Sequence, residues 1–279
     1  MLILLSPAKT FDLHPAGTRS GGRGESPHRS RTEMLTEPRL LEHSAELVET
    51  IADLDVHEIA ELMDTSDNLA AQAREFANDF ELPHSRSNSL PAVLAFHGEA
   101  YRGLAARDRL DTRDLTEAQK TLRILSGLYG VLRPLDLIQP YRLEMGRRIE
   151  TSRGRGLHEF WGSRLTQLVR EDLDASPGEG AIVNLASEEY SSAISLGELV
   201  SEGAPVIAPR FEDEDARGGY RLITVYAKHA RGAMAAWLIQ NRVRRASRLV
   251  DFDAGGYEYV DAVSSPAVPV FRRRFTDRP

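Results

Sequence analysis

The sequence contains no cysteine and very little lysine. Among its 279 residues there are 35 basic residues and no cysteine. Without cysteine the chain has no disulfide framework, no cysteine-based zinc site and no thiol nucleophile. Only three of the basic residues are lysines, Lys9, Lys120 and Lys228, and the others are arginine. Lys9 and Lys228 both follow a predicted strand, where a compact ammonium group serves a different purpose from a forked guanidinium.

Long apolar runs are also missing. No stretch approaches the ~20 apolar residues that a membrane-spanning helix needs. The short apolar run at residues 2–5 has no basic segment before it, so it does not resemble a signal peptide. With 41% hydrophobic and 28% charged residues, the chain can bury a large core and stay in solution. We therefore expect a soluble protein of the cytoplasm.

Sequence motifs of common enzymes and metal sites are absent as well. The eight histidines show no H-x-x-x-H or histidine–carboxylate spacing of a metal site. The chain has no G-x-S-x-G, no Walker loop and no G-x-G-x-x-G. We expect neither a metal site nor a cofactor, although an all-carboxylate iron site on the acidic helices remains an open alternative.

Charge is distributed unevenly along the chain. Residues 33–81 hold 14 acidic and 2 basic residues, a balance of −12, which leaves +5 for the rest of a chain whose net charge is −7. Arginines cluster at 142–170, 242–248 and 272–274. Such clusters suit phosphate contacts, but solvated surface faces have the same pattern.

Apolar periodicity predicts a mixed α/β fold in a single domain covering residues 1–279, with a central mixed sheet, surrounding helices and an acidic helical lobe at about 33–81. The Gly-, Ser- and Arg-rich segment 14–31 is expected to be a flexible loop. The lobe should contain three helices, one of them starting after Asp55. Further helices are predicted at 115–125, 157–173 and 228–246, and strands at 2–5, 92–96, 181–186, 205–211, 219–227, 257–260 and 268–275.

Three of the predicted strands, 2–5, 92–96 and 181–186, end in short polar loops. If these strands run parallel, their loops meet at one edge of the sheet, where α/β proteins place their sites. The residues that would line one cleft are Ser6, Lys9, Glu99, Tyr101, Ser187, Glu189 and Tyr190. An enzyme acting on a nucleotide or another phosphorylated small molecule is therefore one hypothesis, with Lys9 as base or Schiff-base nucleophile and Glu189 as acid.

Two further motifs could bind phosphate. In "LSGLYGVLRP", residues 125–134, two glycines bracket Leu128 and Tyr129. The spacing favours a helix C-cap at Gly127, and the alternative is a hairpin between helices whose backbone N–H groups and Arg133 face a phosphate. In "YAKHARG", residues 226–232, Lys228 and Arg231 would share a face at the start of a helix, a position that attracts anions.

These motifs occur in an order that resembles the YaaA family of bacterial peroxide-stress proteins. The resemblance spans nearly the whole chain and depends on "MLILLSPAKT", "LSGLYGVLRPLDLIQPYRLEMG", "FWG", "VNLASEEY", "VYAKHARGAM" and "GGYEY". The segment 14–31 differs from the usual family text, and His229 stands where a second lysine is common. The block at 125–146 is the most specific part of the match.

The resemblance implies an unusual mixed α/β fold, a positively charged cleft and a helix-hairpin-helix-like element. Members of this family are reported to bind duplex or distorted DNA and are linked to low unincorporated iron under peroxide stress, and no enzymatic activity is implied. The residues that would line the cleft are Ser6, Lys9, Gly127, Tyr129, Gly130, Arg133, Arg142, Lys228 and Arg231. DNA binding is therefore the favoured hypothesis, and the enzyme is its alternative.

Overall fold

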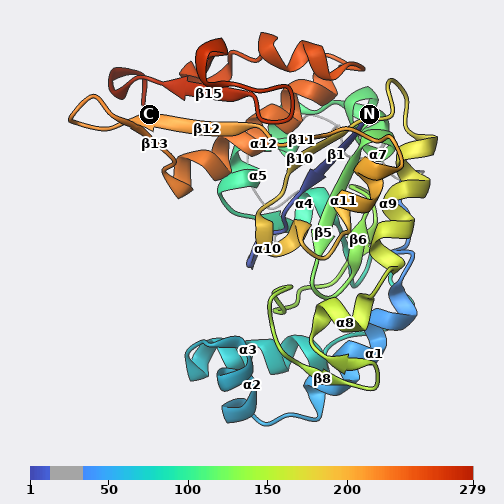
Figure 1. The fold of residues 1–279 in the computed structure, drawn as a ribbon. Helices are drawn as coiled ribbons and strands as arrows, with labels where there is room; N and C mark the ends of the chain where they lie inside the picture. Colours follow the sequence, from blue (N-terminus) through green and yellow to red (C-terminus); the bar gives the residue numbers. More distant parts are fainter. Residues whose placement is uncertain (13–33, 279) are drawn as a thin grey trace, which may run out of the picture.

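A computed structural model describes residues 1–12 and 34–278 of the chain. It has the mixed α/β fold expected from the sequence, with a central sheet, helices around it and a separate helical lobe (Figure 1). The loop expected at 14–31 lies outside the described residues. Among the described helices, none combines the length and apolarity that crossing a bilayer requires.

The central sheet has five strands in the order β11-β10-β1-β5-β6. Their bounds are Val206–Ile207, Ile182–Leu185, Leu2–Leu5, Leu122–Ser126 and Gly130–Leu132. β11, β10, β1 and β5 run parallel, and β6 returns antiparallel to β5. All four residues of β1 are buried, because helices cover both faces of the sheet, which is why this strand reads as an unbroken apolar run.

A four-stranded sheet forms the upper part of the molecule in Figure 1. Its order is β13-β12-β15-β14, with bounds Tyr220–Arg221, Arg210–Glu214, Val270–Arg273 and Glu258–Tyr259. Three two-stranded ladders complete the described strands. They pair β2 (Thr10–Phe11) with β4 (Phe96–His97), β3 (Leu90–Pro91) with β7 (Leu137–Ile138), and β8 (Glu150–Thr151) with β9 (Gly154–Arg155).

The longest helix of the described chain, α12 (Thr224–Gln240), joins the two sheets and packs closely on α5 (Glu99–Leu104). A Cβ at Gly232 would collide with the carbonyl oxygen of Ala100, so only glycine permits this approach. The other helices are α4 (Ala92–Ala95), α6 (Ala106–Arg109), α7 (Thr112–Thr121), α8 (Leu157–Trp161), α9 (Arg164–Ala175), α10 (Glu188–Ser191) and α11 (Leu196–Ser201).

The acidic lobe contains the three expected helices, α1 (Leu41–Ala52), α2 (Val56–Met63) and α3 (Asp67–Asn78), at the bottom of Figure 1. α2 begins with a capping box, in which Asp55 accepts from the Glu58 N–H and the Glu58 carboxylate accepts from the Asp55 N–H. The predicted start after Asp55 is confirmed.

Two predicted elements at the centre of the chain are wrong. The apolar run 92–96 is a turn of helix, α4, followed by the first residue of β4, because a short buried run has no period that separates strand from helix. The helix expected over 115–125 ends at Thr121, and Leu122–Ser126 forms β5 instead. The period was misleading because Leu122 and Leu125 are buried in a strand that has both faces covered.

Other boundaries shift for local reasons. The helix expected at 157–173 is two helices, α8 and α9, separated at Gly162, whose φ of 52° lies in the left-handed region. The expected antiparallel pair exists as β12 and β13, but the residues from Thr224 onward begin α12, and β11 belongs to the central sheet. Both tail strands, β14 and β15, are confirmed.

Candidate functional site

The carboxyl edge of the central sheet brings together one residue from each of the three predicted polar loops. Because β1 and β10 are parallel neighbours, Ser6 and Ser187 follow them side by side. The Ser187 N–H donates to the Ser6 Oγ over 2.8 Å, and the Tyr101 hydroxyl donates to the Ser6 carbonyl oxygen over 3.1 Å. The convergence of Ser6, Tyr101 and Ser187 therefore holds, although β4 pairs with β2 instead of joining this sheet.

Beside this edge, three basic side chains surround one buried carboxylate. The Lys9 Nζ lies 2.8 Å from Glu144 Oε1, the Arg147 Nε lies 2.9 Å from Glu144 Oε2, and an Arg142 guanidinium nitrogen lies 4.0 Å from Glu144 Oε1. We call Lys9, Arg142, Glu144 and Arg147 the Lys9 cluster. It carries three positive charges and one negative charge, so it has a positive excess at the end of the sheet.

Burial divides the Lys9 cluster into an inner and an outer part. The side chain of Glu144 is 4% exposed, that of Arg142 is 14% exposed, and that of Lys9 is 58% exposed. Burial alone would raise the pKa of Glu144, but hydrogen bonds and charge from Lys9 and Arg147 outweigh it and hold the pKa below its usual range. Glu144 is therefore an anion that holds the cations at fixed positions.

A narrow crevice opens between Lys9 and the segment 141–144. It is lined by Pro7, Ala8, Lys9, Tyr141, Arg142, Leu143, Glu144 and Tyr190, and its free volume is about 10 Å³, room for about one water molecule. Burial raises the pKa of the Tyr190 hydroxyl, so this phenol stays protonated. The Arg142 Nε is buried and has no hydrogen-bond partner among the described residues. The crevice can therefore accept a surface group such as a phosphate oxygen, but it is too small to enclose a whole nucleotide.

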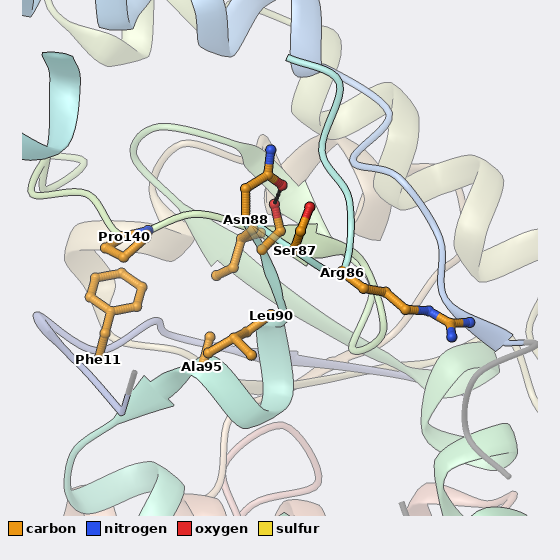
Figure 2. Close-up of a pocket in the computed structure, with 9 residues that line it drawn as sticks. Phe11, Arg86, Ser87, Asn88, Leu90, Ala95 and Pro140 are labelled. Atoms are coloured by element: carbon orange, nitrogen blue, oxygen red, sulfur yellow. Dashed lines mark hydrogen bonds between the residues drawn. The ribbon is translucent and has the colours of Figure 1, made fainter. Parts of the chain in front are cut away.

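A larger cavity is lined by a different set of residues. Its volume is about 260 Å³, and its lining residues are Phe11, Arg86, Ser87, Asn88, Ser89, Leu90, Ala95, Ile138 and Pro140 (Figure 2). Phe11 contacts Tyr141, with ring centroids 5.5 Å apart, and Tyr141 also lines the crevice at Lys9. We call it the Phe11 cavity. The contact between Phe11 and Tyr141 connects this cavity to the crevice at Lys9.

The glycine block at 125–134 is a hairpin between strands. Gly127 and Gly130 bracket the turn from β5 to β6, so the expected helix C-cap and the alternative hairpin between helices are both corrected. Gly130, with a φ of 70°, permits the turn, and the Gly127 carbonyl accepts from the Trp161 indole N–H over 3.0 Å. The usual helix signals misled here because both strands are fully buried.

Two other expected phosphate ligands in this block have structural partners. Tyr129 is fully buried, and its hydroxyl accepts from the Gln139 N–H over 3.0 Å and lies 3.1 Å from a ring nitrogen of His84. Arg133 bonds the buried Asp136 and donates to the Glu37 carbonyl. These contacts hold the hairpin against the segment that leads out of the acidic lobe.

Lys228 and Arg231 lie on α12, where Lys228 is the fifth residue and not at the helix start as expected. Lys228 is exposed, and Arg231 is half-buried. Burial lowers the pKa of Arg231, and no ion pair or hydrogen bond links its guanidinium to the described residues. Neither residue lines the crevice at Lys9. Arg231 is thus a desolvated cation that an external anion would stabilise.

Of the two acidic residues predicted for the site, Glu189 lies near the Lys9 cluster and Glu99 pairs elsewhere. Glu189 lies near the Lys9 cluster, with its Oε1 3.4 Å from the Gly146 nitrogen. Glu99 instead pairs with Arg102 one turn along α5. The residues that sequence reasoning missed are Glu144, Arg147 and the lining of the Phe11 cavity. One acid among three arginines in "YRLEMGRR" was the available signal for Glu144.

Metal-ligand geometry does not occur in the described part of the chain. Within residues 1–12 and 34–278, no group of three or more His, Asp or Glu side chains is placed to hold a metal ion. The chemistry available at this edge of the sheet is that of cations, hydroxyl groups and one buried carboxylate.

Comparison with known proteins identifies the family. The family model described as peroxide stress protein YaaA matches residues 1–263. The chain is 44% identical over 273 residues to a UPF0246 protein of Cellvibrio japonicus, covering 98% of both chains. It is also 44% identical over 282 residues to a UPF0246 protein of Delftia acidovorans, and 43% identical over 279 residues to one of Cupriavidus metallidurans, in each case covering 99% of this chain and all of the relative. The chain belongs to the YaaA family of peroxide stress proteins.

Proposed function

We propose that this protein binds the phosphate backbone of DNA through the Lys9 cluster during peroxide stress. The observation that carries the proposal is the positive excess of Lys9, Arg142 and Arg147 around the buried carboxylate of Glu144. A cluster with this charge, open to solvent at Lys9, matches the anionic backbone of a nucleic acid. A protein with this role would work in the cytoplasm, where the chromosome lies.

The geometry of the cluster suits a phosphate that arrives from outside. Lys9 is largely exposed, so its ammonium can contact a phosphate oxygen without a conformational change. Arg142, whose side chain is 14% exposed, adds positive charge behind Lys9. Charge-assisted hydrogen bonds of this kind are about twice as strong as neutral ones.

Arg231 and Lys228 are the further contacts in this proposal. A guanidinium that is desolvated and has no counterion in the described chain is unfavourable by itself. A bound phosphate would supply that counterion. We therefore expect Arg231→Ala to weaken DNA binding while leaving the free energy of unfolding unchanged or slightly higher.

A salt-dependent binding assay tests the proposal. The substrates are duplex, bubble and single-stranded DNA, titrated from low to physiological salt. Lys9→Gln is expected to weaken binding to all three and to lower the slope of log affinity against log salt by about one, because one phosphate contact is lost. The matched control is Lys120→Gln, which removes the same charge from an exposed position on α7.

Two results would contradict the proposal. One is DNA binding no stronger than that of an acidic control protein. The other is binding that Lys9→Gln, Lys228→Ala and Arg231→Ala all leave unchanged.

The second part of the proposal concerns iron, and only family membership supports it. Peroxide damages DNA through its reaction with unincorporated iron, and we propose that this protein helps to keep that iron low. The measurement is chelatable iron by electron paramagnetic resonance in peroxide-treated cells that lack the protein. Cells that carry wild-type protein should show less iron than cells without it, and equal amounts would refute this part.

The alternative is an enzyme that acts on a nucleotide or another phosphorylated small molecule. The convergence of Ser6, Tyr101 and Ser187 beside Lys9 favours it. A lysine base or Schiff-base nucleophile needs desolvation, however, and Lys9 is 58% exposed and paired with Glu144. Borohydride trapping of carbonyl substrates on Lys9 would support the enzyme, and its consistent failure would remove the Schiff-base version.

A further inference from the structure

We propose that the Phe11 cavity takes one unpaired nucleobase from the nucleic-acid strand whose phosphate lies on the Lys9 cluster. This inference rests on the proposed function and names the form of DNA that the site selects. The cavity, at about 260 Å³, is smaller than a pocket for a drug-sized ligand. Its volume suits one flat ring system and not a base pair.

The cavity has the lining that a nucleobase needs. Its apolar lining includes Phe11, Leu90 and Ala95 from three separate elements, and its polar lining includes Ser87 and Asn88 (Figure 2). A base has an apolar face and a polar edge, so it fits a site with one apolar wall and a rim of hydroxyl groups.

Phe11 supplies the stacking surface. Its ring is half-buried and is held by Phe96 and Tyr141, with centroid distances of 5.3 and 5.5 Å. In Figure 2, Phe11 and Pro140 lie close together at one end of the cavity. An aromatic ring that is already fixed by its neighbours loses little entropy when a base stacks on it.

The rim is fixed before any ligand arrives. The Asn88 Oδ1 accepts from the Ser85 N–H over 2.8 Å and from the Ser89 hydroxyl over 2.8 Å, and the Asn88 side-chain amide donates to the Pro83 carbonyl. These bonds form a closed turn from 83 to 89. This side of the cavity is therefore preorganised.

Chain connectivity sets the spacing between base and phosphate. Phe11 follows Lys9 by two residues, and Pro140 precedes Arg142 by two residues. Each wall thus carries one cavity residue and one residue of the Lys9 cluster, at most about 7 Å apart along the backbone. A phosphate at Lys9 would place the attached base at the cavity only if that base has left the stack, because a paired base stays stacked inside the duplex.

The test compares two DNA ligands that differ only by one base. Both are duplexes with a single-nucleotide bulge, and one carries a thymine at the bulge while the other carries an abasic linker. Charge and backbone flexibility are matched, so the ratio of their affinities reports contacts to the base. Stacking on one aromatic ring predicts that wild-type protein prefers the thymine bulge by at least about fivefold.

Three variants of the full chain locate the effect. Phe11→Leu keeps apolar volume but removes the ring, and Phe11→Tyr is its matched control, which keeps the ring. Ala95→Leu fills the floor of the cavity from α4 and leaves Phe11 in place. We expect Phe11→Leu and Ala95→Leu to reduce the ratio towards one, Phe11→Tyr to preserve it, and all three to bind the abasic duplex as wild type does. Circular dichroism checks that each variant is folded. If Phe11→Leu does not fold, the affinity ratio of Ala95→Leu alone tests the base site.

The outcomes separate this inference from the proposed function. A wild-type ratio near one, or a preference that survives both Phe11→Leu and Ala95→Leu, overturns the base site while DNA binding stands. If wild-type protein binds neither duplex at low salt, the proposed function fails and the base site fails with it. Lys9→Gln should weaken both ligands equally, because it removes a phosphate contact and no base contact.

Discussion

Removing the charge of Lys9 from the Lys9–Glu144 ion pair should lower the free energy of unfolding only slightly. Removing the charge of Glu144 should lower it much more. Lys9→Gln removes the charge of an ammonium group whose side chain is 58% exposed, whereas Glu144→Gln removes the charge of a carboxylate whose side chain is 4% exposed. Exposed ion pairs contribute about 0–1 kcal/mol to the free energy of unfolding. We therefore expect Lys9→Gln to lower it by less than about 1 kcal/mol, since Glu144 keeps Arg147 as a partner.

Glu144→Gln is expected to lower the free energy of unfolding considerably more than Lys9→Gln does. It leaves Arg142 and Arg147, whose side chains are 14% and 24% exposed, without a counterion. Breaking a fully buried pair costs about 3–5 kcal/mol, and the residual exposure of these arginines lowers our expectation to about 2–4 kcal/mol. For a chain of this size, that corresponds to a fall in Tm of roughly 3–7 °C.

Urea denaturation of both variants provides the measurement. The midpoint should shift while the slope m stays constant, because neither change alters the surface exposed on unfolding. The double variant completes a thermodynamic cycle that isolates the pair itself. Equal destabilisation by Lys9→Gln and Glu144→Gln would refute the reasoning, since burial would then not decide the cost.

Three further predictions follow from the same contacts and packing. Because the folded pKa of Glu144 is lowered, its stabilising contribution is present above pH ~4.5 and is lost as pH falls further. The stability of Glu144→Gln should therefore depend less steeply on pH below ~4.5 than that of the wild type, as measured by circular dichroism in an acid titration. Burial lowers the pKa of His84, so stability should fall as pH drops below about 6.5, and His84→Gln should flatten that slope. Gly232→Ala should destabilise by about 1–3 kcal/mol through the collision with Ala100, whereas Gly197→Ala on α11, with open space around it, should be neutral or stabilising in the same melts.

Local sequence signals predicted those elements whose evidence is contained within a few residues. The capping box at Asp55 and Glu58 marked the start of α2, because both bonds form within one turn. The four apolar residues of β1 marked a buried strand. The same signals misassigned Leu122–Ser126 to a helix, since a strand covered on both faces shows no alternation that identifies it.

The candidate site shows the same division between local and distant information. From the sequence came the scarce Lys9 at a strand end, the approach of the Ser6 and Ser187 loops, and family membership. Glu144, which holds the cations in place, and the pairing of Lys9 with a segment more than a hundred residues away came only from the folded structure. Sheet order brings β1 next to both β10 and β5, and no local pattern encodes that order.

Composition, the apolar run of β1 and the ordered motifs were enough to determine the fold class and the family. Tertiary structure alone decided which charges are buried, which cation has no partner among residues 1–12 and 34–278, and where the Phe11 cavity opens. The physical reason is that a charge is read from one residue, whereas its exposure and its counterion depend on neighbours from distant parts of the chain.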